Sequence, residues 1–201
     1  MRLVYLRRVD QIERALPEAA RAWLATIAIA DKLAVLAALS GATRAVGKAP
    51  VAVAARGTWG VDELARAVLL ARAFPRVTPR EVWAHGDNRE RQAVLKALPL
   101  LPQPEQFVEL AVEACRANVL TVFEAIACDN PYAARYFSDA QLNQMALKAA
   151  FNGVQLARIV GLAERANAEL ARMARDFAAE RTAAGRAVPA DLDLLLKGAA
   201  S

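Results

Sequence analysis

Residues that bind metals or act as nucleophiles are scarce in this chain, which has one histidine and two cysteines among 201 residues. A zinc site needs several histidine, cysteine or carboxylate ligands at short spacings, and no such group occurs here. The nine glycines form no phosphate-binding loop, and no serine lies in a nucleophile elbow. The sequence therefore predicts no metal or other cofactor and contains no recognisable catalytic motif.

The two cysteines, Cys115 and Cys128, are poorly placed for a disulfide. On one continuous helix, thirteen steps of about 100° put them on nearly opposite faces and roughly 20 Å apart, which is too far for an S–S bond. We interpret both as structural thiols of a protein in a reducing, cytoplasmic compartment. A reactive thiol is the alternative.

Strand-forming residues and clustered charge are also limited. Aromatic residues make up 6% of the chain, and its 56% hydrophobic content is rich in alanine, which favours helices over strands. The net charge is +5, but lysine and arginine are interleaved with aspartate and glutamate. Because a nucleic-acid interface needs clustered basic residues, the composition predicts an all-α protein that binds no nucleic acid.

We expect neither an export signal nor a membrane span in the N-terminal part. Residues 1–20 are basic and amphipathic, but they include three carboxylates, which signal peptides avoid. Residues 19–42 are the most apolar stretch, interrupted by Arg21, Asp31 and Lys32 well before the roughly 20 residues that span a bilayer. This stretch predicts a core helix, and a weak peripheral membrane contact is the alternative.

Prolines and glycines divide the chain into helices of ordinary length. The predicted helices cover residues 61–74, 89–98, 105–116, 119–128, 138–160 and 167–184, followed by a short tail helix from Val188. Pro17 fits a first helical turn and Gly41 a helix end, and the predicted connectors are residues 47–50, 57–60, 75–80, 98–106 and 129–131. Asp87 with Glu90, and Ser138 or Asp139, are predicted to cap the helices that follow them.

Short helices joined by proline-containing turns are typical of a HEAT-like right-handed α-solenoid of antiparallel helix pairs. A compact helical bundle is the alternative. We expect a single all-helical domain over residues 1–201, with N-terminal helices in 1–56, a core in 59–186 and a tail in 187–201.

The predicted helix over 138–160 carries a polar stripe between two apolar faces. Gln144, Lys148, Asn152 and Gln155 follow one another at spacings of four, four and three, which places them on one side of a helix. The stripe is either a solvent-exposed face or one wall of a polar pocket. Asn152 and Gly153 both disfavour a helix interior, which indicates close packing or a local break.

Glu124 is the one candidate for a general base. It stands among apolar neighbours in VLTVFEAIAC, so a buried carboxylate here needs a partner such as Lys148, Arg116 or Arg158. The following DNPYAARYF segment adds tyrosines that either close over a small polar ligand or fill a gap between helices. The only histidine, His85, precedes a Gly-Asp-Asn turn and is most readily a turn residue.

Two sets of candidate site residues follow from these patterns. The candidate ligand-binding residues are Arg116, Asn118, Glu124, Asn130, Tyr132, Tyr136, Asn143, Gln144, Lys148, Asn152 and Arg158. The secondary candidates are His85, Asp87, Asn88 and Arg91.

Four motifs carry a resemblance to a known family: HGDNRERQAVLKALPLLP, ACRANVLTVFEAIACDNPYAARYF, LNQMALKAAFNGVQLARIVGL and ERTAAGR. Together they resemble the EboA-domain proteins over residues 59–186. The resemblance implies an all-helical protein encoded in the ebo gene cluster, which is associated with secondary-metabolite production and precursor export. It implies no established reaction for the helical member.

Three functions remain open at this point. The first is a non-catalytic scaffold or binding protein that presents a polar pocket or concave surface to a small polar metabolite or to another protein of the ebo cluster. The second is a cofactor-independent isomerase or lyase acting on a cyclitol or sugar-derived intermediate, with Glu124 as general base. The third is a peripheral membrane adaptor. The absence of catalytic motifs favours the first.

Overall fold

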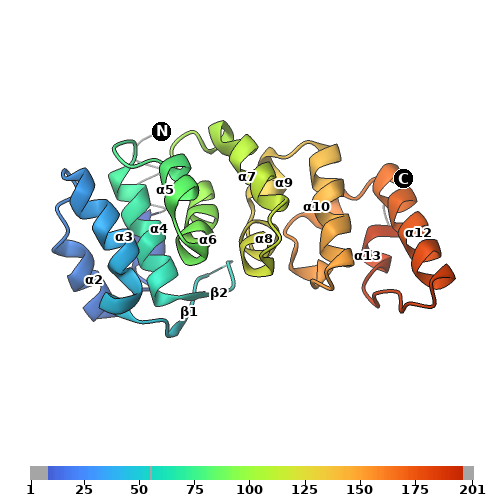
Figure 1. The fold of residues 1–201 in the computed structure, drawn as a ribbon, viewed down its shortest axis with the longest axis horizontal. Helices are drawn as coiled ribbons and strands as arrows, with labels where there is room; N and C mark the ends of the chain where they lie inside the picture. Colours follow the sequence, from blue (N-terminus) through green and yellow to red (C-terminus); the bar gives the residue numbers. More distant parts are fainter. Residues whose placement is uncertain (1–8, 55, 197–201) are drawn as a thin grey trace. The chain divides into compact units, whose positions relative to one another are not determined.

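The computed structural model describes residues 9–54 and 56–196, and it is mostly helical (Figure 1). The chain forms two compact units, one ending at Leu110 and the other beginning at Ala111. Residues 1–8 of the predicted N-terminal helices and residues 197–201 of the predicted tail lie outside the described residues. The predicted helical class is confirmed in the main, and the HEAT-like solenoid stays a prediction.

The first unit contains helices and one short hairpin. Its elements are α2 (Glu18–Ala25), α3 (Lys32–Val46), β1 (Pro50–Ala52), β2 (Thr58–Gly60), α4 (Val61–Ala73), α5 (Pro79–His85), α6 (Asn88–Ala97) and the 3-10 turns η1 (Leu98–Leu100) and η2 (Pro104–Phe107). Helix α7 (Val108–Cys115) begins at its end.

Helix α4 forms the centre of the first unit. Every residue of α4 except Arg72 is buried, and the helix packs against α2, α3 and α6. Alanine and leucine on all sides allow such close contact with several neighbours, since a helix that is apolar all round belongs in a core. Polar side chains at its N-terminal end are buried with it.

The apolar stretch over residues 19–42 forms two helices, so the prediction of one core helix is wrong. The Asp31 carboxylate accepts hydrogen bonds from the backbone N–H groups of Leu33 and Ala34 and caps α3. Gly41, predicted to end a helix, lies inside α3. No helix among the described residues has both the length and the apolar character needed to cross a bilayer.

Four predicted connectors, 47–50, 57–60, 75–80 and 98–106, contain regular structure. Strands β1 and β2 pair antiparallel with Val51 opposite Trp59, and this short hairpin is a local exception to the predicted all-α class. Helix α5 begins within the predicted linker 75–80, because Thr78 caps it and Glu81 completes a capping box. The cap of α6 is confirmed as predicted, with the Asp87 side chain accepting from the Glu90 N–H.

The second unit holds the remaining elements. They are the end of α7, then α8 (Leu120–Ala127), α9 (Tyr132–Tyr136), α10 (Asp139–Phe151), η3 (Leu156–Arg158), α11 (Leu162–Arg165), α12 (Ala168–Ala183) and α13 (Asp193–Leu196). Helix α10 packs against both α8 and α12. The predictions for α8 and α12 are confirmed within one or two residues.

Helix α10 begins as predicted but ends early. Ser138 caps it, with a capping box completed by Gln141. The predicted extension to residue 160 is wrong, because Gly153 adopts a left-handed φ of 69°. Its N–H donates to the Ala150 carbonyl and the Val154 N–H to the Ala149 carbonyl, which is the Schellman pattern that terminates helices. The Asn-Gly pair is therefore a local break.

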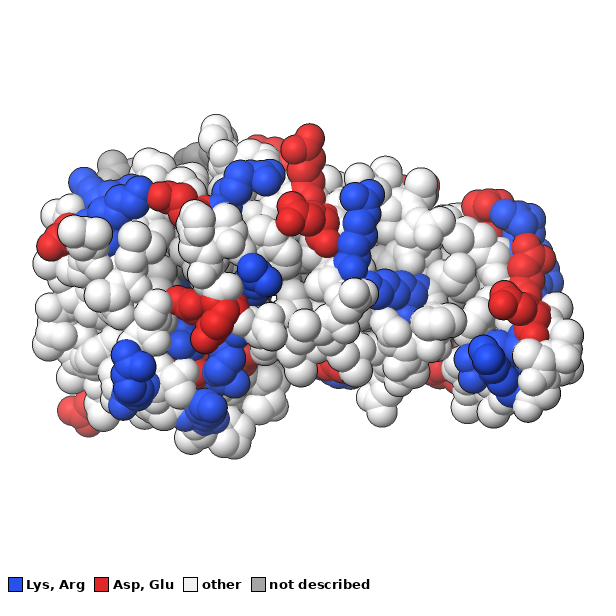
Figure 2. Space-filling view, viewed as in Figure 1, with Lys and Arg blue, Asp and Glu red and all other residues white. Residues whose placement is uncertain are grey.

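The charged side chains follow the dispersed pattern of the sequence. On the face shown in Figure 2, Lys and Arg side chains are interspersed with Asp and Glu over both units. No extended patch of one sign is visible on this face.

Candidate functional site

The second unit contains a groove between α7 and α10, which we call the α7–α10 groove. Its volume is about 530 Å³, within the range of about 300–1,000 Å³ typical of ligand pockets. It is lined by Val112, Cys115, Arg116, Phe137, Ala140, Gln141, Gln144, Met145 and Lys148. Apolar side chains and the cysteine make up the floor, and two cations and two amides supply its polarity.

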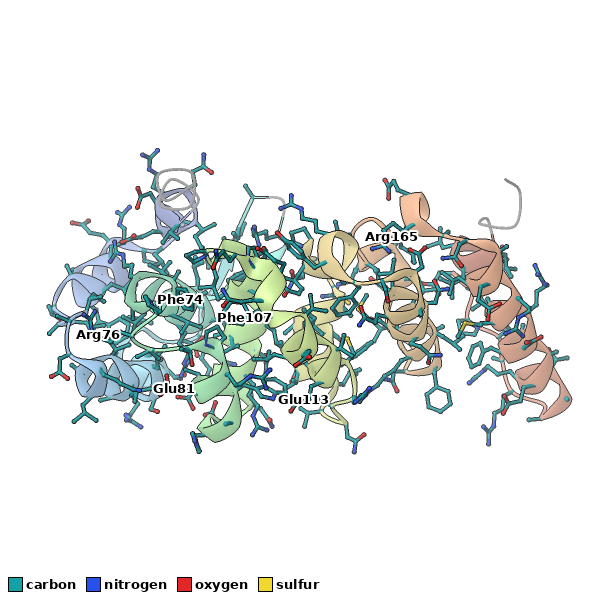
Figure 3. The ribbon with its side chains drawn as sticks, turned by 90° about the horizontal axis from the view of Figure 1, so that it is seen from above. Phe74, Arg76, Glu81, Phe107, Glu113 and Arg165 are labelled. Carbon is teal, nitrogen blue, oxygen red and sulfur yellow. The ribbon has the colours of Figure 1, made fainter. Side chains whose placement is uncertain are left out.

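Local capping and hydrogen bonds position this lining. Ser138 caps α10, so that Ala140, Gln144 and Lys148 follow on one face of the helix. Arg165, labelled in Figure 3, donates from Nη1 to the carbonyls of Ala134 and Phe137 at 3.0 and 2.8 Å. These bonds fix the turn between α9 and α10.

Lys148 joins α10 to the end of α7. Its Nζ donates to the carbonyls of Cys115 at 2.7 Å and Ala117 at 2.8 Å, and it lies 5.1 Å from the centre of the Phe123 ring. A cation at the last carbonyls of a helix satisfies acceptors that the helix itself leaves unpaired. Lys148 is thus both a groove residue and a cap of α7.

The cysteines do not supply a nucleophile. Burial raises the pKa of the Cys115 thiol to about 12, against the opposing charges of Lys148 and Arg116. Burial likewise raises the pKa of Cys128 to about 11. Both are free. Cys115 is the last residue of α7, whereas Cys128 directly follows α8, so the two do not lie on one continuous helix. Protonated, buried thiols are unreactive, which supports their structural interpretation.

A second groove lies on the other side of α10, between α10 and α12. This α10–α12 groove has a volume of about 560 Å³ and is lined by Gln144, Leu147, Lys148, Phe151, Met173, Asp176, Phe177 and Glu180. Phe151 is exposed. Gln144 and Lys148 line both grooves, while the two carboxylates of α12 occur only in this second lining.

The structure brings together three of the eleven predicted ligand-binding residues. Arg116, Gln144 and Lys148 line the α7–α10 groove. The polar stripe stops after Lys148, since Asn152 lies at the end of α10 and Gln155 beyond the break, both exposed. Asn118 is exposed in the loop before α8 and lines neither groove.

Glu124 pairs with Arg158, one of its three predicted partners. Arg158 Nη1 lies 3.0 Å from Glu124 Oε2, and Arg158 Nη2 lies 2.9 Å from Asp129 Oδ2. Glu124 is half-buried, and it lines neither the α7–α10 nor the α10–α12 groove. The arginine therefore ties the end of α8 to η3, away from the groove cations.

The remaining candidates of the second unit bond within the protein. Asn130 is buried and bonds to the Ala125 carbonyl and the Tyr132 N–H. The ring of Tyr132 is fully buried, 4.9 Å from the ring of Tyr136, so these aromatics fill a gap between helices. Asn143 exchanges two amide hydrogen bonds with Asn167, at 3.0 and 3.1 Å.

The secondary candidates lie in the first unit. Arg91 donates to the Trp83 carbonyl at 3.0 Å and stacks 5.4 Å from the Trp83 ring centre. Asp87 caps α6, and Asn88 is exposed at the start of that helix. His85 is the exposed last residue of α5, so it lies in a helix and not in the turn expected from its sequence.

A buried charge cluster in the first unit was missed by sequence reasoning. Asp62 is fully buried, and its Oδ2 accepts from Thr43 at 2.6 Å, Arg66 at 2.8 Å and Arg89 at 2.8 Å. Beside it, Glu63 accepts from Lys96 at 2.9 Å and from the Gly60 N–H at 2.8 Å. The i, i+4 spacing of Asp62 and Arg66 was the available signal.

This cluster joins three helices and has a structural role. Although burial opposes it, hydrogen bonds from Arg89, Thr43 and Arg66 hold the pKa of Asp62 well below its usual range. A Cβ at Gly60 would approach Asp62 Oδ1 to 2.7 Å, so the chain requires glycine there. Because the carboxylate is fully bonded to α3, α4 and α6, it stabilises their packing.

Comparison with protein families gives one match. The family model described as "Metabolite traffic protein EboA" matches residues 10–197, nearly the whole chain. No curated protein and no solved structure matches the chain.

Proposed function

The chain belongs to the EboA family, and we propose that it is a non-catalytic helical binding component of a metabolite pathway, which takes a small metabolite in the α7–α10 groove. The family's description as metabolite traffic proteins supports a role in binding and transfer. The proposal includes a HEAT-like α-solenoid as the architecture, since short helices joined by proline-containing turns are typical of it. Its partners would be enzymes of the same pathway.

The composition of the groove lining carries this proposal. A groove of about 530 Å³ is lined by apolar side chains, two cations and two amides, with no carboxylate or histidine. Its one thiol has a pKa raised to about 12 by burial. General acid–base or nucleophilic catalysis needs a group that titrates near the working pH, and these lining residues supply none. They supply shape, apolar contact and positive charge, which serve binding.

The alternative enzyme with Glu124 as base has less support. Its carboxylate is bonded to Arg158 and lies outside both grooves. A general base must reach the proton that it removes from a bound substrate, and neither groove brings a ligand to Glu124. Binding without chemical change is therefore the better supported function.

Filling the groove tests this function. Ala140 is exposed on α10 and lines the α7–α10 groove, so Ala140→Trp should occupy the groove without disturbing the core. Titration of the isotope-labelled protein with a sugar alcohol, an aliphatic amide and an aliphatic carboxylate, followed by amide NMR shifts, should show binding at α7 and α10. The variant should lose this binding.

The matched control is Ala179→Trp, an exposed alanine of α12 that lines neither groove; it should bind like the parent. Mass spectrometry should recover the bound compound unchanged. Binding that survives in Ala140→Trp, or conversion of the compound to a product, would contradict the proposal.

A further inference from the structure

The charges that line the two grooves of the second unit differ in sign. Arg116 and Lys148 are the charged residues of the α7–α10 lining, whereas the α10–α12 lining combines Lys148 with Asp176 and Glu180. A carboxylate in the lining would neutralise a cation or repel an anionic ligand. The α7–α10 groove alone therefore presents a positive charge without an acidic lining residue.

Arg116 and Lys148 act on the same part of the groove. The Cys115 thiol lies within the field of both, since each charge opposes the rise in its pKa caused by burial. Lys148 is fixed there by the carbonyls of Cys115 and Ala117. An ammonium has three N–H donors, so these two bonds leave one for a ligand. Arg116 stands exposed at the rim, next in the chain to Cys115.

Four of the other lining residues are apolar. Val112 of α7 faces the groove with Phe137, Ala140 and Met145, the last two on α10. Phe137 and Met145 are nearly fully buried, so they form a fixed floor and not a mobile rim. A flexible thioether beside an aromatic ring accommodates aliphatic groups of varied shape. The lining also contains Gln141, whose amide oxygen accepts from the Ser138 N–H, and the exposed Gln144.

From this arrangement we propose that the ligand of the α7–α10 groove is an amphipathic organic anion, whose carboxylate or phosphate group lies between Arg116 and Lys148 and whose apolar body rests on Phe137 and Met145. This inference rests on the proposed function, because it names the chemical class of the ligand. A charge-assisted hydrogen bond to each cation favours an anionic head over a neutral one of equal size.

Three eight-carbon probes test the class of ligand. Isothermal titration calorimetry of the full chain should give a lower Kd for octanoate or octyl phosphate than for octanamide. We expect a difference of about tenfold for one charge-assisted hydrogen bond. The comparison of octanoate with octyl phosphate identifies the head group. Butyrate, which has the charge but a shorter body, should bind more weakly than octanoate because it buries less apolar area.

Substitutions test whether the preference for anionic probes arises in the α7–α10 groove. Arg116→Gln should reduce the preference for the anion over octanamide, while Arg175→Gln, an exposed arginine of α12 outside both linings, should leave it unchanged. Ala140→Trp should abolish binding of all four probes.

The outcomes separate the two proposals. Octanamide binding as tightly as octanoate, with both blocked by Ala140→Trp, would overturn the anionic class and leave the proposed function standing. A full anion preference in Arg116→Gln would also overturn it. No binding of any probe would count against both.

Discussion

Lys148 belongs to the polar stripe of α10, and its role depends on two carbonyls that the stripe does not reveal. The sequence places it on the same helix face as Gln144. In the folded chain its ammonium reaches the carbonyls of Cys115 and Ala117, 33 and 31 positions away. A bond between residues so distant in the sequence depends on how α7 packs against α10, so helical periodicity alone cannot specify it.

We predict that Lys148→Met lowers the free energy of unfolding of the second unit by about 2 kcal/mol, because it leaves partly buried carbonyls at the end of α7 without a donor. Native-state hydrogen exchange should show faster exchange for the amides of α7 and α10. Arg175→Met, which removes an exposed cation from α12, is the control and should change stability by less than about 0.5 kcal/mol. Equal effects of the two would contradict the capping role.

Glu124 and Asp62 show why buried charge is hard to infer from neighbours in the sequence. Glu124 stands among apolar residues, yet it is half-buried beside Arg158. Asp62 stands next to another carboxylate, as an exposed helix start does, yet it is fully buried. Adjacent residues of a helix point in different directions, so the burial of each depends on the helices packed around it.

Two glycines with opposite effects on their helices illustrate what decides an element's length. Gly41 lies inside α3 with an ordinary φ, and a Cβ there would meet only Arg44 Nη2 at 3.9 Å. Gly153 follows α10 with φ 69° and open space around it. The sequence predicted that Gly41 ends a helix and that Gly153 marks either close packing or a local break. The backbone conformation separates a tolerated glycine from one that ends a helix.

The paired substitutions should therefore change stability in opposite directions. Gly41→Ala should stabilise the first unit by about 0.5–1 kcal/mol, because glycine costs that much in a helix interior. Gly153→Ala should destabilise the second by about 1 kcal/mol, because an L-residue is strained in the left-handed region. Hydrogen exchange of α3 and α10 measures both. Stabilisation by Gly153→Ala would contradict the left-handed end of α10.

The end of α10 also marks the limit of periodicity as a predictor. Leu156 and Val160 continue the apolar spacing of α10 past the break, so the pattern indicated a helix to residue 160. The chain instead turns at Gly153 and places the Leu156 N–H 2.7 Å from the Asp191 carboxylate. This contact with a distant segment satisfies the backbone N–H after the turn, while Leu156 stays buried and Val160 is exposed.

At the scale of the whole chain, the tryptophans and the buried charge cluster around Asp62 both lie in the first unit. All three tryptophans, Trp23, Trp59 and Trp83, precede Leu110, so tryptophan fluorescence reports on the first unit. The buried charge cluster around Asp62 lies in the same unit. The α7–α10 groove belongs to the second, so stability of one and ligand binding of the other can be measured separately.

The stability of the first unit should depend on Asp62 at acid pH. Its pKa is lowered in the folded state, so its stabilising contribution is complete above the unfolded value near 4 and is lost as the pH falls below it. Urea unfolding followed by tryptophan fluorescence should show the free energy of unfolding falling as the pH is lowered from about 5 toward the folded-state pKa of Asp62.

Asp62→Asn should lower stability at pH 6 by about 3 kcal/mol, because it leaves buried Arg66 without its counterion, and its pH dependence should be flatter. Glu105→Gln removes an exposed carboxylate of η2 and should keep the parent's pH profile. A parent-like acid decline in Asp62→Asn would show that other groups cause it.

The sequence by itself determined the helical class, most helix starts and the family, because alanine content, capping residues such as Asp87 and Ser138, and extended motifs are local properties of the chain. It also identified Arg116, Gln144 and Lys148, which line the α7–α10 groove, as candidate ligand-binding residues. Tertiary packing alone decided which polar residues line a groove, which carbonyls Lys148 caps and which carboxylate is buried. These depend on contacts between helices distant in the sequence, whose side-chain directions no local pattern records.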